Sequence, residues 1–505
     1  MSEFKANQLF VKVLEISKEL FYMCEKIILS LGFLSNWRLS PLSKSTLTAF
    51  LYAFRDFTFY VDQFERRVSE SVTLPKHSKK IENSLHKLSL IVDARDKMNS
   101  LEHKKSLVRK IEAQLQIAYS LGDRSKLQKS IDDLTELKRE IYLSSPLKSL
   151  GLEMVSSDIF GAFGHMGLGL DILSMMKDLG ELQDRSLFAL MQNTQNDCLR
   201  NHFSEFLTLV ECPSLYSRNQ IKNTFSEVRQ GLDVFHCETE SFYNTKAYNK
   251  LSQRIREESI HRNFIRLRED EIALGQEFLA SFGLEENDWF VLLHVRESKS
   301  RIGTAANASL GDYMDAVDKI LDSGGFVFRM GHKGMSKIVE RRGYFDYANS
   351  QRKSASLDIF LYANCQFLIG TASGPCSIPS PFGRPILYTN APSWGFTYDQ
   401  TGFFVPQLIR EKKTNKLINI ERAVETPLVW SNSEINKSPW ERVPNSSQLI
   451  SNAVNDMLTN AFLSKTTVEE QKFIDIVDQG SLFGRARPAP SFLKYLNEEK
   501  LLVES

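Results

Sequence analysis

Two apolar segments about seventy residues apart constrain the fold of this chain more than any other feature. Residues 289–296 read WFVLLHVR, and residues 368–390 read LIGTASGPCSIPSPFGRPILYTN. Each is an apolar run that ends in small, polar or charged residues. This pattern is typical of a buried parallel strand that delivers ligand-binding groups at its carboxyl end. If both strands belong to one sheet, their ends converge on a single crevice.

The polar residues that end the first segment predict a site for an anion. Strand alternation places His294 and Arg296 on one side of the sheet, with Val295 facing away. An arginine at this point can form paired hydrogen bonds to a phosphate, and it stays charged when buried. The alternative interpretation is that Arg296 pairs with a carboxylate such as Glu297 and that the backbone satisfies His294.

The second segment continues through small residues into an expected helix. Residues 370–375 read GTASGP, and Pro375 suits the first turn of a helix. Free amides at a helix start point at an anion, and the hydroxyl groups of Thr371 and Ser373 can donate to it as well. With the cation of Arg296 expected on one side of the crevice and these amides on the other, the two segments together predict a diphosphate site. The alternative is a tight turn that holds no ligand.

Arg329 ends a third apolar run, FVFRM at 326–330, just before Gly331. A second cation next to Arg296 is unfavourable to bury unless an anion lies between the two. A diphosphate would supply that anion. The alternative is an arginine at the surface.

A glycine-rich segment, FGAFGHMGLGLD at 160–171, supplies two candidates for a general base. We expect a strand, a glycine-rich turn and then a helix over 155–180, with His165 in the turn and Asp171 on the first helical turn. A histidine titrates near neutral pH, which suits a general base. The alternative is that His165 only bonds to backbone. The glycines also indicate that something bulky lies close to this backbone.

The pattern along the chain predicts helices first and α/β structure afterwards. Apolar stripes at helical spacing run through the first 150 residues. Gly122 is expected to end one helix, and Asp123 or Ser125 to cap the next. A partner-binding coiled coil and an intramolecular bundle are the two alternatives. From there, short β-rich runs alternate with helical stretches, as in βα units. We therefore expect a helical region at 1–150, α/β lobes at 151–283 and 284–460 with the ligand cleft between them, and a helical tail at 461–505.

Individual elements can also be predicted inside the two α/β lobes. Expected strands of the first lobe lie at 186–191, 207–211 and 233–238. Expected strands of the second lobe lie at 289–295, 326–330, 366–370 and 385–389. Between them we expect helices at 310–321, with Ser309 and Asp312 as a capping pair, and at 357–364.

Composition narrows the class of protein. A net charge of +1 argues against a nucleic-acid binder, and 42% hydrophobic residues are ordinary for a soluble globular protein. The six cysteines are scattered without a CxxC pair, which argues against a zinc site and favours a reducing compartment. We expect a cytoplasmic protein. The aromatic segment 50–64 is expected to be an amphipathic helix packed on its neighbours, and contact with the inner face of the membrane is the alternative. No metal-binding motif accompanies the anion site, so arginine, histidine and amides are expected to neutralise the phosphates without a metal ion.

Several ordered segments together resemble a family of bacterial surface-polysaccharide glycosyltransferase-like proteins. The resemblance covers roughly residues 150–495 and is carried by LLHVRES (292–298), NASLGDYMDAVDKILDSGGFVFRMG (307–331), YFDYANS (344–350), SLDIFLYANCQFLIGTASG (356–374), FGRPILYTNAP (382–392), PSFL (490–493) and the FGHMGLGLD turn (163–171). Such proteins look like GT-B glycosyltransferases, which have two Rossmann-like lobes, need no metal and hold the nucleotide sugar mainly in the C-terminal lobe. The H-x-R after a strand is also similar to fucosyltransferase-type donor sites.

The resemblance implies a glycosyltransferase that moves a sugar from a nucleotide sugar to a glycan, lipid-linked or protein acceptor, with no cofactor besides the donor. Arg296 would hold and stabilise the departing diphosphate, and His165 or Asp171 would deprotonate the acceptor. The implied donor-binding residues are His294, Arg296, Arg329, Gly331, Asp346, Tyr347, Thr371, Ser373, Gly374 and Ser377. The alternatives are a sugar-nucleotide epimerase or hydrolase on the same fold, and a non-catalytic binding scaffold that works through residues 1–150.

Overall fold

The structure of the protein is a computed structural model. It describes residues 107–144, 152–210, 234–297, 304–394, 402–431, 435, 438–477 and 487–502, with short gaps inside the first three ranges. The predictions for residues 1–106, including the membrane contact at 50–64, lie outside the described residues.

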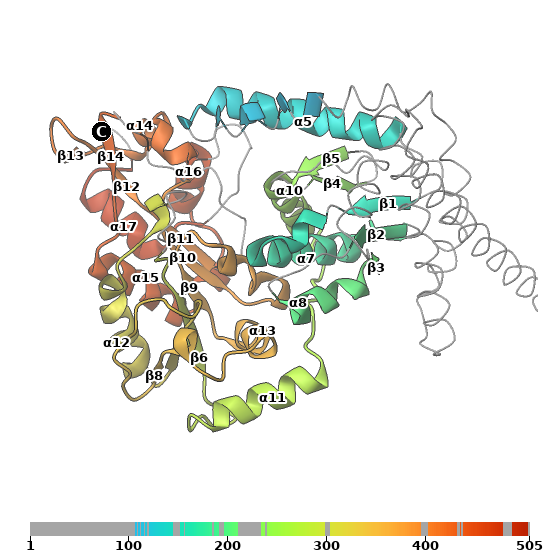
Figure 1. Ribbon diagram of the computed structural model, residues 1–505. Coiled ribbons are helices and arrows are strands. Elements are labelled where there is room, and N and C mark those ends of the chain that lie inside the picture. Colours follow the sequence, from blue (N-terminus) through green and yellow to red (C-terminus); the bar gives the residue numbers. More distant parts are fainter. Residues whose placement is uncertain are drawn as a thin grey trace, which may run out of the picture.

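Six parallel strands form the large sheet, which contains both apolar segments (Figure 1). Its strands are β6 (Phe290–His294), β7 (Phe326–Arg329), β8 (Tyr344–Phe345), β9 (Leu368–Gly370), β10 (Ile386–Ala391) and β11 (Gly402–Pro406). Their order across the sheet is β11-β10-β9-β6-β7-β8. The chain thus starts in the middle, builds outward to β8, and then returns to build outward on the other side. This is the order of doubly wound nucleotide-binding sheets, and its direction reverses between β6 and β9.

Both faces of the large sheet are buried. Along β6, Val291 and Leu293 belong to one hydrophobic cluster, whereas Phe290 and Leu292 belong to another. Because successive side chains of a strand alternate, these clusters lie on opposite faces. Helices α12 (Met314–Asp322) and α15 (Ser447–Leu458) cover the first face, called here the α12 face. Helices α11 (Glu269–Ala280) and α13 (Ala355–Asn364) cover the second, called the α13 face.

The predicted elements of this sheet are confirmed to within two residues, except at the start of α12. The strands at 289–295, 326–330, 366–370 and 385–389 correspond to β6, β7, β9 and β10, and the helix at 357–364 corresponds to α13. The expected helix at 310–321 begins as a 3-10 turn, Leu310–Tyr313, and becomes α-helical only at Met314. The side chain of Ser309 makes no capping bond, so the predicted capping pair is wrong.

A small parallel sheet precedes the large one. It consists of β1 (Leu152–Val155), β2 (Ser186–Leu190) and β3 (Thr208–Val210), with α7 (Phe163–Asp178) and α8 (Asp197–His202) as its crossovers. The predicted strand at 233–238 exists as β4 (Val234–Cys237), but it pairs with β5 (Glu240–Tyr243) in a separate hairpin. Buried side chains of α7 belong to the same cluster as the α13 face, so α7 and the large sheet share one core.

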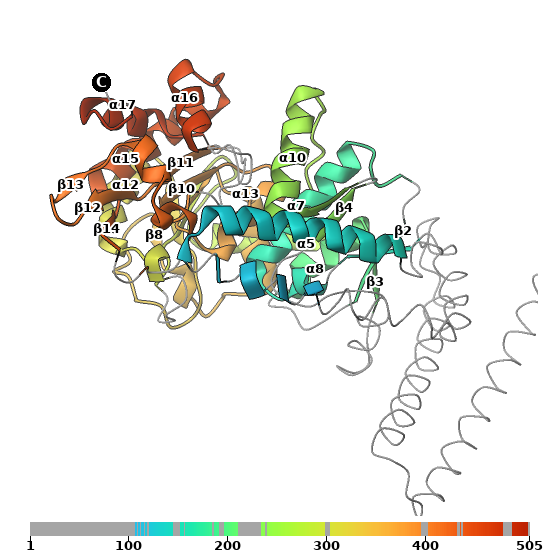
Figure 2. The same cartoon turned by 90° about the horizontal axis from the view of Figure 1, so that it is seen from above.

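The predicted helical hairpin around residue 122 is confirmed for residues 107–144. Gly122 has a φ of +65°, in the left-handed region, and the carboxylate of Asp123 accepts a hydrogen bond of 3.1 Å from the amide of Lys126 at the start of α5 (Arg124–Ser144). Buried residues of the hairpin join the core of the α12 face: Leu115, Ala118, Leu127 and Ile131. The hairpin therefore packs on its own chain, and α5 extends from there to the β4–β5 hairpin (Figures 1 and 2).

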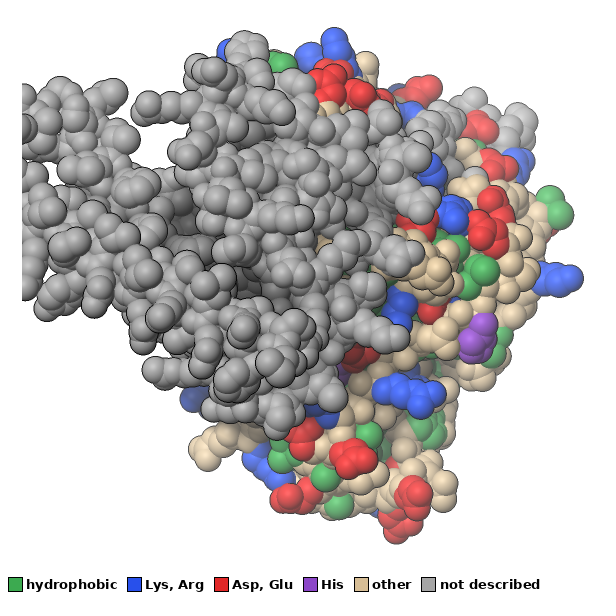
Figure 3. Space-filling model, turned by 90° about the vertical axis from the view of Figure 1, so that its right-hand side faces the viewer, with side chains coloured by type: hydrophobic (Ala, Val, Ile, Leu, Met, Phe, Trp, Pro, Cys, Tyr) green, Lys and Arg blue, Asp and Glu red, His purple; other side chains and the backbone are tan. Residues whose placement is uncertain are grey.

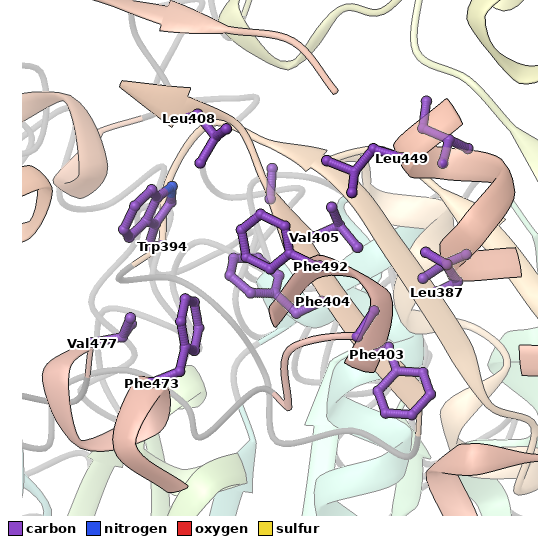
Figure 4. Packing of buried hydrophobic residues seen from close by; sticks show 14 of the residues in the cluster. Leu387, Trp394, Phe403, Phe404, Val405, Leu408, Leu449, Phe473, Val477 and Phe492 are labelled. Atoms are coloured by element: carbon purple, nitrogen blue, oxygen red, sulfur yellow. The ribbon is translucent and has the colours of Figure 1, made fainter. Parts of the chain in front are cut away.

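The C-terminal helices are part of the core and do not form a separate tail. Phe473 of α16 (Val468–Val477) and Phe492 of α17 (Pro490–Glu498) are both fully buried. They pack together beside Phe403 and Phe404 of β11 (Figure 4). This cluster closes the α12 face at the edge of the sheet.

The remaining elements lie around these sheets. They are α10 (Asn244–Glu257), α14 (Ile420–Val424) and an antiparallel sheet of β12 (Leu408–Glu411), β13 (Lys416–Leu417) and β14 (Trp440–Val443). Within the described ranges, no helix has both the length and the apolar character needed to cross a membrane. On the side shown in Figure 3, acidic and basic side chains are interspersed over the described surface.

His202, the last residue of α8, connects the small sheet to α11 through a buried charged pair. Its Nε2 lies 3.2 Å from Oε2 of Glu271, and its Nδ1 lies 3.6 Å from Oε1 of Glu205. Burial of the imidazole opposes its charge, but the two carboxylates outweigh that effect and raise the pKa of His202 to about 9.

We expect this pair to make stability depend on pH on the alkaline side. The pKa of His202 is raised on folding, so its contribution is fully present below pH 6.5 and is lost as the pH rises through about 9. The loss is of the order of 3 kcal/mol in the free energy of unfolding. Urea unfolding at pH 6 and 9.5 measures the difference in the free energy of unfolding between the two pH values. His202→Gln should reduce this difference, whereas His332→Gln, at an exposed position, should leave it unchanged. An unchanged pH dependence in His202→Gln would contradict this assignment.

Candidate functional site

The ends of β6 and β9 meet at the point where the strand order of the large sheet reverses. The amide of Thr371 donates to the carbonyl of His294 over 3.1 Å, and the amide of Arg296 donates to the hydroxyl oxygen of Thr371 over 2.9 Å. The predicted convergence of the two strand ends is therefore confirmed. In doubly wound sheets, this reversal is where ligands bind.

His294 and Ser373 form a hydrogen-bonded pair at these ends. Nε2 of His294 lies 3.0 Å from the hydroxyl oxygen of Ser373. Burial lowers the pKa of His294 to about 4, and the positive charges of Arg329 and Arg296 act in the same direction. The imidazole is therefore neutral near pH 7, and a positive charge beside this pair has to come from an arginine.

The predicted alternation at the end of β6 is confirmed by its core residues. Val295 is fully buried in the cluster of the α12 face, together with Val291 and Leu293. His294 follows Phe290 and Leu292 in alternation and thus points to the α13 face. Strand β6 ends at His294, so the side on which Arg296 lies, two residues later, stays a prediction. Glu297, expected as the alternative partner of Arg296, is instead bound to Arg329.

Arg329 lies on the opposite face from His294 and already has anionic partners. The strand register pairs it with Leu293, which faces α12. Its guanidinium is fully buried, 2.9 Å from Glu297 and 3.5 Å from Asp346, and it donates over 2.5 Å to the carbonyl of Ser336. The expectation that this arginine needs a ligand anion is therefore wrong, because two carboxylates balance its charge. Glu297 and Asp346 lie 32 and 17 residues from Arg329, so no local sequence pattern could predict these ion pairs.

Three further residues of the expected donor set have packing roles in the described structure. Gly331 lies against Met335, whose sulfur would overlap a Cβ at this position. Asp346 accepts hydrogen bonds inside the loop after β7 as well as the ion pair with Arg329. Tyr347 is buried with its ring 5.5 Å from that of Phe278, and its hydroxyl donates to the carbonyl of Ser354 over 3.4 Å.

The turn after β9 differs from the expected helix. It forms a 3-10 helix of four residues, Gly374–Ser377, and then another short one, Ser380–Phe382. These turns are too short to offer the aligned amides of an α-helix. Thr371 is also engaged, since its amide and its hydroxyl oxygen both bond to the backbone of β6. Four residues of the expected donor set lie together at or just after these strand ends: His294, Arg296, Ser373 and Gly374.

The glycine-rich segment is the first half of an α-helix and not a turn. Helix α7 begins at Phe163, so His165 is its third residue and Asp171 lies in its third turn. The glycines of this helix make room for the turn after β9, which is the bulky neighbour that the sequence predicted. A Cβ at Gly164 would overlap the Cα of Gly374, and a Cβ at Gly167 would lie 2.7 Å from Cδ1 of Ile378.

Ser377 connects these two backbones by a hydrogen bond. Its hydroxyl lies 2.7 Å from the carbonyl oxygen of Gly164 and 3.0 Å from that of Gly374. His165 follows Gly164, and Ser373 precedes Gly374, so both candidate residues flank the same close contact. The start of α7 therefore lies at the carboxyl ends of β6 and β9, although the two segments are some 200 residues apart.

Asp171 is fully buried, and it lies in a polar cluster that joins α7 to segments farther along the chain. Its carboxylate accepts hydrogen bonds from Arg262 over 2.7 Å, from Tyr248 over 2.9 Å and from Ser380 over 2.5 Å. Sequence analysis did not identify these three donors, because they lie 77 to 209 residues from Asp171. With three donors around it, this carboxylate is a junction between α7, α10 and the turn after β9.

Comparisons with known proteins give a fold-level likeness only. No family model and no curated protein matches this sequence. Among solved structures, it is similar to a glycosyl transferase family 9 protein from Veillonella parvula (13% identity, TM-score 0.35, covering 58% of this chain and 94% of that one). It is also similar to ADP-heptose lps heptosyltransferase II from E. coli (11% identity, TM-score 0.30, covering 59% and 97%).

We expect Gly164→Ala to destabilise the protein although it lies in a helix. Helix propensity alone would favour alanine by about 1 kcal/mol. The added Cβ overlaps the backbone of Gly374, which cannot move as a flexible side chain could, and overpacking of this kind costs about 1 to 3 kcal/mol. Urea unfolding measures the change. Gly311→Ala is the matched control, because its nearest atom lies at an ordinary 3.4 Å. A Gly164→Ala variant more stable than wild type would refute the close contact.

Proposed function

We propose that this protein is a glycosyltransferase that moves a sugar from a nucleotide-sugar donor to a glycan, lipid-linked or protein acceptor. The observation that carries the proposal is the meeting of His294, Arg296 and Ser373 at the reversal point of a doubly wound sheet. A second parallel sheet presents the start of α7 to the same strand ends. The sequence resemblance implies a GT-B enzyme, and the two parallel sheets among the described residues support this proposal.

Arg296 supplies the positive charge for the donor diphosphate in this proposal. Its guanidinium can form paired hydrogen bonds to phosphate oxygens and stabilise the charge that develops as the sugar leaves. Ser373 offers a hydroxyl, and the exposed backbone of Gly374 follows it. His294 orients Ser373 and remains uncharged. The proposed donor site omits Arg329 and Asp346, which neutralise each other on the opposite face.

His165 is the proposed general base for an inverting transfer. It lies half-buried in the first turn of α7, next to the contact with the turn after β9. Asp171, the other candidate, is fully buried and accepts three hydrogen bonds, so it is a poor proton acceptor for a substrate hydroxyl. The cytoplasm is the proposed compartment. The described cysteines Cys198, Cys365 and Cys376 support it, because all three are free thiols.

Arg296→Ala should weaken the binding of nucleoside diphosphates and nucleotide sugars by roughly 10- to 100-fold, because a charged hydrogen bond is lost. A thermal-shift screen with ADP, GDP, UDP and CDP identifies the nucleotide that raises the unfolding temperature, and calorimetry measures its affinity. Arg422→Ala is the matched control, since Arg422 is half-exposed on α14 and pairs with Glu411. If none of these nucleotides or their sugars binds, or if both variants bind equally well, the proposal fails.

His165→Gln should lower kcat at least about a hundredfold while KM for the donor stays close to the wild-type value, because the base acts on the acceptor. Turnover with labelled donor measures both constants, and the product shows the reaction class. Release of free sugar or an isomerised nucleotide sugar would point to the hydrolase or epimerase alternative. Normal turnover in His165→Gln would remove this residue as the base.

A further inference from the structure

Directly behind Arg296, on the α12 face, three residues close a ring of hydrogen bonds. Arg329 donates from Nη2 to Oε1 of Glu297 over 2.9 Å and from Nη1 to the carbonyl oxygen of Ser336 over 2.5 Å. The amide of Ser336 donates back to Oε2 of Glu297 over 3.0 Å. Each member contacts the other two, so both carboxylate oxygens of Glu297 are held in place.

The charges around this ring favour an ionised Glu297. Burial acts to raise the pKa of its carboxyl group, but hydrogen bonds from Ser336 and the charge of Arg329 outweigh it, and the pKa of Glu297 lies below its ordinary value. Arg329 itself is fully buried, and Asp346 lies on its other side at 3.5 Å. The ring is thus a buried charged anchor beside the end of β6.

This anchor is covalently next to the residue that the proposed function uses. Arg296 precedes Glu297, and its own backbone is held at both ends: its amide donates to Thr371 over 2.9 Å, and its carbonyl accepts from the amide of Ala308 over 3.2 Å. The peptide that follows Arg296 is fixed by the side chain of Glu297. Residue 296 is therefore tied to β9, to the loop after β6 and, through Glu297, to β7.

We propose that Glu297, held by Arg329 and Ser336, is the positioning residue that fixes the direction of the Arg296 guanidinium. This inference rests on the proposed function, because it concerns the cation of the proposed diphosphate site. Arg296 and Glu297 share a peptide unit, so a backbone rotation that frees Glu297 also moves Arg296. An arginine side chain is long, and a small backbone rotation displaces its tip by about an ångström or more. Misplacement of that size can cost a binding or catalytic group up to about a hundredfold.

Asp346 provides a matched control for the charge of the ring. It is the second carboxylate on Arg329, but it lies in another loop and has no covalent link to Arg296. Asp346→Asn disturbs Arg329 while leaving Glu297 bound to both of its partners. An effect of Glu297 that operates only through the buried charge of Arg329 should appear in both variants. An effect through the position of Arg296 should appear only when Glu297 changes.

A double-mutant cycle tests the proposal directly. The probe is whichever of ADP, GDP, UDP and CDP binds the wild-type protein most tightly, and calorimetry gives its affinity for wild type, Glu297→Gln, Arg296→Ala and the double variant. Glu297→Gln keeps the reach of the side chain and removes its charge. Glu297→Asp keeps the charge and shortens the reach, and it serves if the first variant does not fold. Thermal unfolding without ligand is recorded for every variant.

We expect Glu297→Gln to weaken binding between about 10- and 100-fold in the wild-type background and less than about twofold in the Arg296→Ala background. Asp346→Asn should leave the affinity within about twofold of wild type. If Glu297→Gln weakens binding equally in both backgrounds, or if Asp346→Asn weakens it as much, positioning is refuted while the donor site stands. If no probe binds, or if Arg296→Ala changes no affinity, the proposed function fails and the positioning role fails with it.

Discussion

The backbone contact between Gly164 and Gly374 is the constraint on which the rest of the site depends. Neither position has room for a Cβ, so the first turn of α7 lies directly on the turn after β9. The hydroxyl of Ser377 closes the contact by donating to a carbonyl of this pair, and the buried carboxylate of Asp171 gathers three donors two turns further along the helix. These polar contacts lie within one shared hydrophobic core. They bring the start of α7 to the carboxyl ends of β6 and β9, where the proposed reaction takes place.

The two faces of the large sheet divide the charged residues into two functions. On the α13 face, His294 lies buried at the end of β6 and is hydrogen-bonded to Ser373. On the α12 face, Arg329 forms ion pairs with Glu297 and Asp346, and these pairs connect β7 to the loops that follow β6 and β8. Arg329 is in register with Leu293, the residue before His294. Because side chains alternate along a strand, this difference of one position places Arg329 and His294 on opposite faces. Buried histidines show the same dependence on neighbours: carboxylates raise the pKa of His202, whereas burial and nearby arginines lower that of His294.

The elements of the large sheet, the convergence of its strand ends and the break at Gly122 can be predicted from the sequence, because each depends on local pattern. The wrong predictions concern side chains whose partners are distant in sequence. The sequence favours a ligand role for Arg329 because its carboxylate partners are far away in the chain, and it favours the first helical turn for Asp171 because glycines normally mark turns. In this chain the glycines lie inside the helix, where close packing against another segment outweighs their poor helix propensity.

The sequence by itself determined the alternation of strands and helices and the polar ends of β6 and β9, since strand periodicity and turn chemistry are encoded within a few residues of each other. Only the tertiary structure decided the strand order of the large sheet and which of the polar residues are paired with carboxylates. That choice depends on strand register, on the face to which each side chain points, and on partners up to 213 residues away, such as Ser377 for Gly164. Burial and pairing of charges are properties of the assembled core, and no local pattern specifies them.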